Sequence, residues 1–520
     1  MGGHSTRSTE RRGTTAEAGE RTPPDRSRAA LLAIVALVAF AARLTPVLRG
    51  GGLGSHRQYD DGVYFAAADA LTFGLVPYRD FVLLHPPGIT VVLVPFALLG
   101  RLTSDAVGMG GARVAFMAVG ALNAVLVAAL ALRWRATAAV VAGGLYALWR
   151  AAVESERTVL LEPLGTTATL AALHLLLGAR RSPRAEIAAG AVLGLAVTLK
   201  IWYVVPWAVI VVWHVRQRRT AARVLAGGLA AMGSVLIPFV ALAGRRMYEM
   251  VIAAQVGRPP FGGSALERVP RILGLPGAPT IAAGAAVLLV LAAARCWPDR
   301  RARLVVAILA ANLVVLLASP GYFDHYSALV AAPAAVVLAV GLGAPSLRPP
   351  GLARPVWLAA VPTVALVGAT LSGQGVTVAP HGAPVSGWRL AAAAPPGCIA
   401  TDDPQILIQM DRLSRSFELG CPMPVDVTGT TFHSLRHLGA DGRPVRRRCN
   451  PAWNAYLYDY FVSADAFVLV RTRPDGALSS ETVRALTAFP VVAASHGLVM
   501  RSARNEPAPR PAAPSCAAGR

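Results

Sequence analysis

Long apolar runs separated by short arginine-rich segments dominate the sequence. Runs of roughly 15 to 23 residues can each cross the hydrocarbon core of a bilayer as a helix. We expect such spans near residues 29–47, 111–132, 136–152, 163–179, 186–199, 201–215, 221–243, 280–295, 304–318, 326–343 and 355–372. The pattern therefore predicts a polytopic α-helical membrane protein with about 11 transmembrane helices.

The composition agrees with this class. Of the 520 residues, 54% are hydrophobic, and the mean hydropathy of +0.51 is too high for a soluble enzyme. The net charge of +22 would also suit a nucleic-acid-binding protein. We exclude that class because the basic residues form short clusters between apolar runs, and no basic face with interleaved aromatic residues is present.

The arginine clusters orient the spans, because cytoplasmic loops carry an excess of basic residues. With the spans above, one side of the membrane receives Arg26 and Arg28, Arg133 and Arg135, Arg180, Arg181 and Arg184, Arg216, Arg218 and Arg219, Arg300, Arg301 and Arg303, and Arg348 and Arg354. The apolar run 89–99 is too short to span, so we expect a helix at the outer surface. Asp60 and Asp61 are then extracytoplasmic, in a multi-pass protein of the cell membrane.

Four regions follow from these patterns. We expect a disordered cytoplasmic tail (1–28), a transmembrane domain (29–372) with candidate chemistry in its outer loops (48–110, 153–163 and 319–326), a small extracytoplasmic α/β domain (373–501) and a disordered tail (502–520). In the α/β domain, apolar stretches at 397–401, 425–428 and 467–471 alternate with helical patterns at 404–415, 452–462 and 481–489. A signal peptide cleaved near Ala39-Phe40-Ala41 is the alternative for the N-terminus.

Three of the five cysteines, Cys398, Cys421 and Cys449, lie in the α/β domain. A disulfide persists in an oxidising compartment, so we expect one here, with Cys398–Cys421 favoured and Cys421–Cys449 next. A metal site on these cysteines is disfavoured because no CxxC or HxxxH spacing accompanies them.

Asp60 and Asp61 form an acidic pair just outside the first span. A carboxylate there could accept a proton from an attacking hydroxyl, or hold a divalent cation such as Mg²⁺ or Mn²⁺ that binds a leaving phosphate. Adjacent side chains diverge on a helix or strand, so we expect one of the two to face a site, with Asp60 favoured. An ordinary helix N-terminus would also explain these acids.

Glu162 and Lys200 both lie at span boundaries. Glu162 begins a span, where an unpaired carboxylate is costly, so a partner or ligand is implied; a surface pair with Arg157 is the alternative. Lys200 is the only lysine in the chain and could reach an anion such as a lipid phosphate, while snorkelling to ordinary headgroups is the alternative. His325-Tyr326 in a further outer loop would suit phosphate binding or an aromatic belt.

The order of these motifs resembles the GT-C superfamily of integral-membrane glycosyltransferases. The motifs are the acidic pair Asp60-Asp61, the segment His85-Pro86-Pro87-Gly88, the stretch from Arg157 to Glu162, the stretch from Gly194 to Lys200, and His325-Tyr326. The chain looks similar to the protein-mannosyltransferase and aminoarabinose-transferase branch and its actinobacterial relatives. The resemblance covers roughly residues 29–345, and its least specific part runs from Arg157 to Glu162.

This resemblance implies an enzyme that moves a sugar from a polyprenyl-phosphate-sugar donor to an acceptor hydroxyl on the extracytoplasmic face. By the same resemblance, Asp60 or Asp61 activates the acceptor, Lys200 engages the donor phosphate, Glu162 is the acid of the second loop, and His325 and Tyr326 lie near the lipid phosphate. Mannose or arabinose is the expected sugar, and the acceptor is a protein, a lipid or a polysaccharide.

Two other functions stay open. A transporter or flippase of lipid-linked sugars would share the spans, although transporters tend to carry ionisable groups near the midplane and internal repeats. A non-catalytic scaffold would use the α/β domain as its binding module.

Overall fold

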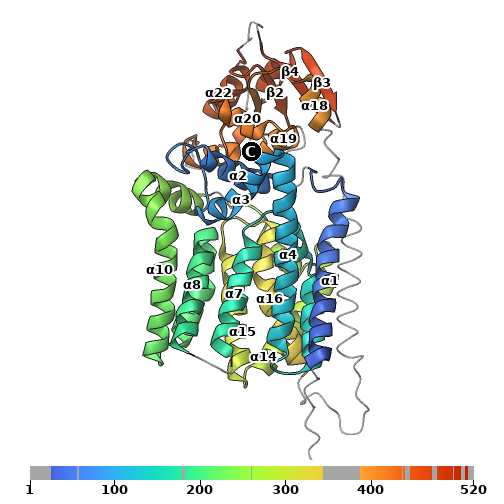
Figure 1. Ribbon diagram of the computed structural model, residues 1–520, viewed down its shortest axis with the longest axis vertical. Coiled ribbons are helices and arrows are strands. Elements are labelled where there is room, and N and C mark those ends of the chain that lie inside the picture. The colour runs from blue at the N-terminus through green and yellow to red at the C-terminus, as the bar shows by residue number, and fades with distance from the viewer. Residues whose placement is uncertain are drawn as a thin grey trace, which may run out of the picture.

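The computed structural model describes residues 25–55, 58–178, 182–258, 260–343, 387–435, 437–439, 445–470, 477–495, 497–504, 510–512 and 514. The expected span at 355–372 and most of the two terminal tails lie outside these residues. Within them, long helices form a bundle, and a small α/β domain covers one end of this bundle (Figure 1).

Among the described residues, six helices are long and apolar enough to cross a membrane. They are α1 (Asp25–Arg49), α4 (Asp105–Ala131), α10 (Arg218–Ala243), α14 (Pro279–Cys296), α15 (Arg300–Ala318) and α16 (Ala328–Leu342), the last extended by the 3₁₀-helix η3 (Asp324–Ser327). A seventh span would combine α5 (Ala136–Leu148) and α6 (Arg150–Glu156), which are bent by 58°. The expected count of about 11 is therefore not confirmed within the described residues.

Shorter helices replace three of the expected spans. They are α7 (Glu162–Leu177), α8 (Pro183–Leu199) and the pair η1 (Ile201–Tyr203) and α9 (Val204–Trp213). In Figure 1, α7 and α8 stand beside α10 and α15 as members of the bundle. The break between α8 and η1 falls at Lys200, whose backbone is extended (φ −147°, ψ 125°), so the chain is interrupted at a candidate site residue.

Two further helices lie between the bundle and the α/β domain (Figure 1). They are α2 (Tyr59–Thr72) and α3 (Gly88–Leu102), and the second matches the surface helix expected at 89–99. The connection after α10 contains only short elements, namely α11 (Arg245–Tyr248), the π-helix η2 (Glu249–Ala253), α12 (Ala254–Val256) and α13 (Ala265–Ile272).

The C-terminal domain contains a four-stranded sheet in the order β1-β2-β4-β3. Its strands are β1 (Ile399–Thr401), β2 (Ala466–Leu469), β3 (Val491–Ser495) and β4 (Leu498–Ser502), and its helices are α18 (Gly387–Ala393), α19 (Pro404–Gln409), α20 (Leu413–Glu418), α21 (Val427–His433), η5 (Arg447–Cys449), α22 (Pro451–Val462) and α23 (Ser480–Thr487). Strands β1 and β2 pair in parallel, and β4 runs antiparallel to β2 and β3.

The expected strands at 397–401 and 467–471 correspond to β1 and β2. The expected apolar stretch at 425–428 is not a strand, because the Asp426 carboxylate accepts a hydrogen bond from the Gly429 amide and caps α21. The helical pattern at 404–415 is divided into α19 and α20 at Asp411, which has a φ of +54°.

The C-terminal domain docks on α2 and α4 through buried polar contacts. The Asp105 carboxylate accepts hydrogen bonds from the Leu413 amide (2.8 Å) and the Ser414 hydroxyl (2.6 Å). Gly62 of α2 lies so close to Gln405 of α19 that a Cβ would come within 2.5 Å of the Gln405 side chain. At Gly62, the two parts are thus packed together without space for a larger residue.

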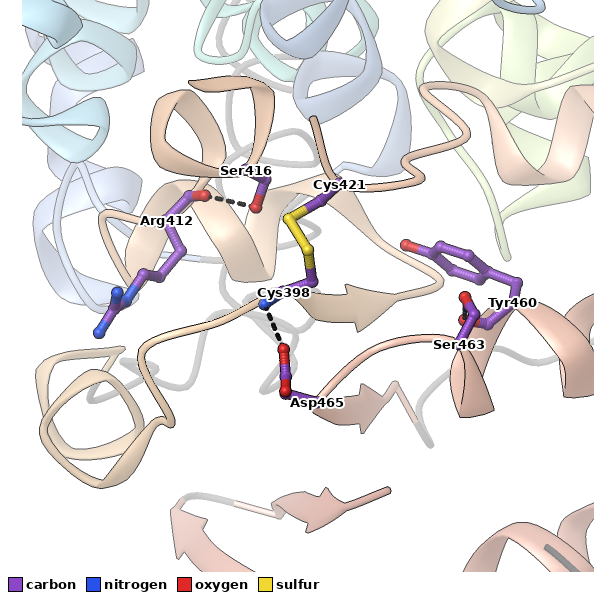
Figure 2. Close-up of a disulfide and its surroundings, with 7 residues drawn as sticks. All are labelled: Cys398, Arg412, Ser416, Cys421, Tyr460, Ser463 and Asp465. Carbon is purple, nitrogen blue, oxygen red and sulfur yellow. Dashed lines mark hydrogen bonds between the residues drawn. A yellow bond between two sulfur atoms is a disulfide. The ribbon is translucent and has the colours of Figure 1, made fainter. Parts of the chain in front are cut away.

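A disulfide joins Cys398, just before β1, to Cys421, just after α20 (Figure 2). It encloses the segment of α19 and α20 that docks on the membrane domain. The Cys398 amide also donates to the Asp465 carboxylate (2.9 Å). The pair favoured from the sequence is therefore confirmed. Cys449 is also disulfide-bonded, so this domain takes part in more than the one bridge that was expected.

Candidate functional site

Lys200 and Glu162 form a buried ion pair where α8 ends and α7 begins. The Lys200 Nζ atom lies 2.5 Å from Glu162 Oε1, and the two side chains are 5% and 1% exposed. The same ammonium lies 3.5 Å from the centre of the Tyr326 ring and 4.7 Å from the Trp202 ring. Two aromatic faces and a carboxylate therefore surround the single lysine of the chain.

Local sequence explains how these groups meet. Glu162 is the first residue of α7, where a negative charge is favoured by the helix dipole. The Tyr203 hydroxyl donates to the Glu162 carbonyl (2.9 Å), and Gly165 allows the approach, since a Cβ there would lie 2.0 Å from the Tyr203 ring. The region after Lys200 is thereby fixed against the start of α7.

The two adjacent aspartates have different surroundings. Asp61 is fully buried, and its Oδ2 atom lies 2.8 Å from Nη2 of Arg113 on α4; it also accepts a hydrogen bond from Gln405. Asp60 is half-buried on another face of α2, and its charge interacts with Glu162, Lys200, Arg258 and Asp426. Asp60 is thus the member of the pair whose charge interacts with the lysine site.

Arg258 and Asp426 also belong to this group, although neither was predicted as a site residue. Arg258 follows α12, and its charge interacts with Tyr326 and with Asp60. Asp426 lies in the C-terminal domain, and its Oδ1 accepts a hydrogen bond from the Tyr59 hydroxyl (3.0 Å). Tyr59 directly precedes Asp60 in the chain. The site therefore combines the bundle, α2 and the C-terminal domain.

The remaining predicted residues occupy different places. His325 is buried, lies against the Tyr326 ring with a centroid distance of 4.7 Å, and interacts with Glu162 and Lys200. His85 makes an edge contact with the Tyr64 ring (5.7 Å) and interacts with Lys200. Arg157 instead interacts with Glu154 and Arg150, so the alternative in which it pairs with Glu162 is wrong.

The electrostatics separate Asp60 from an ordinary surface acid. Burial, followed by the negative charge of Asp426, raises the pKa of Asp60 to about 7, while Arg258 and Lys200 act against that rise. Burial and the nearby charges of Lys200 and Arg258 lower the pKa of His85 well below its usual value, so this imidazole is neutral at neutral pH. Asp60 is consequently poised to take up or release a proton near pH 7.

Two buried polar atoms at the site have no hydrogen-bond partner among the described residues. They are Oε2 of Glu162 and Nε of Arg258. Since buried polar groups are normally paired, these atoms indicate where a bound ligand would make contacts.

The expected metal at Asp60 or Asp61 fits this arrangement poorly. Asp61 is paired with Arg113, and the part of the chain that the structure describes contains no group of three His, Cys, Asp or Glu side chains that could hold a metal ion. We therefore assign no step to a metal.

Comparisons with known proteins identify the fold. No protein-family model matches the chain, and no curated protein sequence matches it. Among solved structures, ArnT from Cupriavidus metallidurans bound to undecaprenyl phosphate is similar, with a TM-score of 0.59 and 18% identity over 93% of this chain and 99% of that one. The archaeal oligosaccharyltransferase AglB from Archaeoglobus fulgidus, in complex with an inhibitory peptide and a dolichol-phosphate, has a TM-score of 0.58 and 12% identity over 85% of this chain and 69% of that one. Both are GT-C glycosyltransferases, so this chain has a fold similar to theirs.

Proposed function

We propose that this protein is a membrane glycosyltransferase that uses a polyprenyl-phosphate sugar as donor and an acceptor hydroxyl on the extracytoplasmic face. The observation that carries the proposal is the grouping of Asp60, Lys200 and Arg258 around Tyr326, where the helix bundle meets the C-terminal domain. The similar structures in complex with undecaprenyl phosphate and a dolichol-phosphate support the choice of donor.

Two cations suit the phosphate of such a donor. Arg258 has a buried, unpartnered Nε–H, and Lys200 presents a compact ammonium beside the same tyrosine. Phosphate would satisfy the free donor of Arg258 and share Lys200 with Glu162. Both cations would stabilise the negative charge that gathers on the phosphate as the sugar leaves.

Asp60 would act as the general base. The acceptor O–H bond loses its proton to the Asp60 carboxylate, the acceptor oxygen forms a bond with the anomeric carbon, and the bond from that carbon to the phosphate oxygen breaks. The electron pair of the broken bond remains on the polyprenyl phosphate, held by Lys200 and Arg258. A carboxylate with a pKa near the working pH is suited to this transfer.

The arginine clusters favour an extracytoplasmic site. Trp134 Nε1 donates to Asp299 (3.0 Å), and Arg133 donates to the Leu177 carbonyl, so residues 133–135, the end of α7 and residues 297–300 lie together. Leu177 ends α7, whereas Glu162 begins it, so the candidate site lies at the opposite end of the bundle. Basic loops are cytoplasmic in most membrane proteins, which would place the C-terminal domain outside.

Incubation of the purified protein in lipid nanodiscs with labelled polyprenyl-phosphate mannose and polyprenyl-phosphate arabinose tests the function. We expect one donor to be consumed, with release of polyprenyl phosphate, and Asp60→Asn to lose this turnover. Asp80→Asn is the matched control, because Asp80 is an exposed acid that pairs with Arg79. A transporter would move such lipids without consuming them, which would contradict the proposal.

A further inference from the structure

Arg258 is supported by the C-terminal domain. Its Cζ atom lies 4.7 Å from the centre of the Phe432 ring of α21, and α12 packs against that helix. The Asp426 carboxylate, which caps α21, interacts with the same guanidinium. One short helix of the C-terminal domain therefore supplies both an aromatic face and a negative charge to Arg258.

The segment that carries Arg258 provides little support of its own. It follows α12, which has three residues, and it lies between Gly257 and Pro259 in the sequence. A long arginine side chain loses rotamer freedom when it is held in one position, so its placement depends on neighbours from other elements. Tyr326 of the membrane domain interacts electrostatically with the guanidinium, and the Phe432 ring of the C-terminal domain lies against it.

Phe432 is itself held in place. Its ring also lies 5.3 Å from Cζ of Arg447, and the Arg447 Nε donates to the hydroxyl of Thr431 (3.1 Å). A second guanidinium thus fixes the ring from within its own domain.

We propose that Phe432 is a positioning residue that holds Arg258 at the donor phosphate, so that donor binding depends on the C-terminal domain. The inference rests on the proposed function, since it takes the anion at Arg258 to be the phosphate of a polyprenyl donor. It assigns the C-terminal domain a part in donor binding, in addition to any contact with the acceptor.

Substitutions at Phe432 separate a positioning role from a structural one. Phe432→Leu keeps an apolar side chain of similar size but removes the aromatic face, whereas Phe432→Trp keeps that face. Phe417→Ala is the control, because Phe417 is another half-buried phenylalanine of this domain that contacts the membrane domain. The centre of its ring lies 5.7 Å from that of Phe73, in the loop after α2.

Titration of the full-length protein with undecaprenyl phosphate measures the effect directly, and donor KM and kcat are measured in parallel. We expect Phe432→Leu to weaken binding by about 3- to 10-fold and to raise KM more than it lowers kcat. Phe432→Trp and Phe417→Ala should remain within about twofold of the wild type. Unchanged binding in Phe432→Leu, or equal weakening in Phe417→Ala, would overturn the inference while wild-type turnover still supported the function. A wild type that neither binds this lipid nor consumes a donor would overturn both.

Discussion

The ammonium of Lys200 lies 2.5 Å from Oε1 of Glu162 at the junction of α7 and α8. Both groups are buried, so the lysine side chain does not extend to the protein surface as snorkelling would require. A buried ion pair costs desolvation free energy and is a weak means of stabilisation. Under the proposed function, its place beside Tyr326 would allow a donor phosphate to share the lysine with the glutamate.

The first prediction concerns this pair. Lys200→Met should weaken binding of polyprenyl phosphate by about 10-fold or more, and should also destabilise the protein by about 3–5 kcal/mol, because Glu162 is left as an unpaired buried charge. Glu162→Gln in the same background should recover the Tm without recovering lipid binding. Lys200→Arg should recover binding only in part, since a planar guanidinium replaces a compact ammonium. Normal binding by Lys200→Met would exclude the lysine from the phosphate site.

The second prediction is a pH dependence. Burial and Asp426 raise the pKa of Asp60 to about 7, so the carboxylate is protonated below that pH and ionised above it. A base must be ionised, so kcat should fall about tenfold per pH unit below about pH 6 and level off above about pH 8. The measurement is the rate of sugar transfer at saturating donor over this range. A rate that stays constant between pH 5 and pH 8 would contradict the role of Asp60 as the base.

The third prediction concerns the stability of the domain contact at Asp69. Burial and the charge of Asp105 raise the pKa of Asp69 from its ordinary value of 3.8 to about 7, although the Ser414 hydroxyl donates to it (3.0 Å). The native state then binds the proton more tightly than the unfolded state, so stability is highest at low pH and is lost as the pH rises from about 4 to 7. Asp69→Asn removes the costly charge and should raise the Tm at pH 8 by about 3 °C or more. A lower Tm in this variant at pH 8 would show that the ionised form is stabilising.

The fourth prediction concerns the disulfide between Cys398 and Cys421. The bridge closes a segment with a sequence separation of 23, which carries Gln405 and Ser414 to the membrane domain. Replacing both cysteines by serine should lower the free energy of unfolding by about 2–4 kcal/mol. Peptide mapping without reductant should recover the linked pair, and Cys296 should label as a free thiol after denaturation. Free thiols at both 398 and 421 in the native protein would contradict this arrangement.

The candidate site was only partly predictable from sequence. Lys200 and Glu162 could be chosen because a charge at the end of an apolar run is unusual, and the divergence of Asp60 and Asp61 follows from helix geometry. Arg258 could not be singled out, because the chain has many arginines and this one lies in a short connection between helices. Asp426 could not be singled out either, because an aspartate before a helix is an ordinary N-cap. Only the folded chain brings these two to the lysine, since they lie 58 and 226 positions away in the sequence.

The fold had similar limits. The long apolar helices and strands β1 and β2 follow from their patterns, but β3 and β4 were not expected. Strand β3 lies at the edge of the sheet, and Val491 and Val492 are exposed, so it lacks the buried alternation that marks a strand. Helix α7 begins at the charged residue Glu162, and α8 ends directly before Lys200, so both helices are shorter than the six candidate spans of the bundle.

The measurement that tests the account most directly is sugar transfer by Asp60→Asn compared with Asp61→Asn and the control Asp80→Asn. Asp60→Asn keeps the size of the side chain and removes its basicity, so the account predicts a loss of transfer of about 10²-fold or more with normal binding of undecaprenyl phosphate. Its Tm should be no lower than that of the wild type, because the substitution removes a carboxylate whose ionisation is made costly by burial. Asp61→Asn should instead lower the Tm, because it breaks the buried pair with Arg113. Asp80→Asn should transfer sugar at the wild-type rate. Near wild-type transfer by a well-folded Asp60→Asn protein would contradict the central claim that Asp60 is the base.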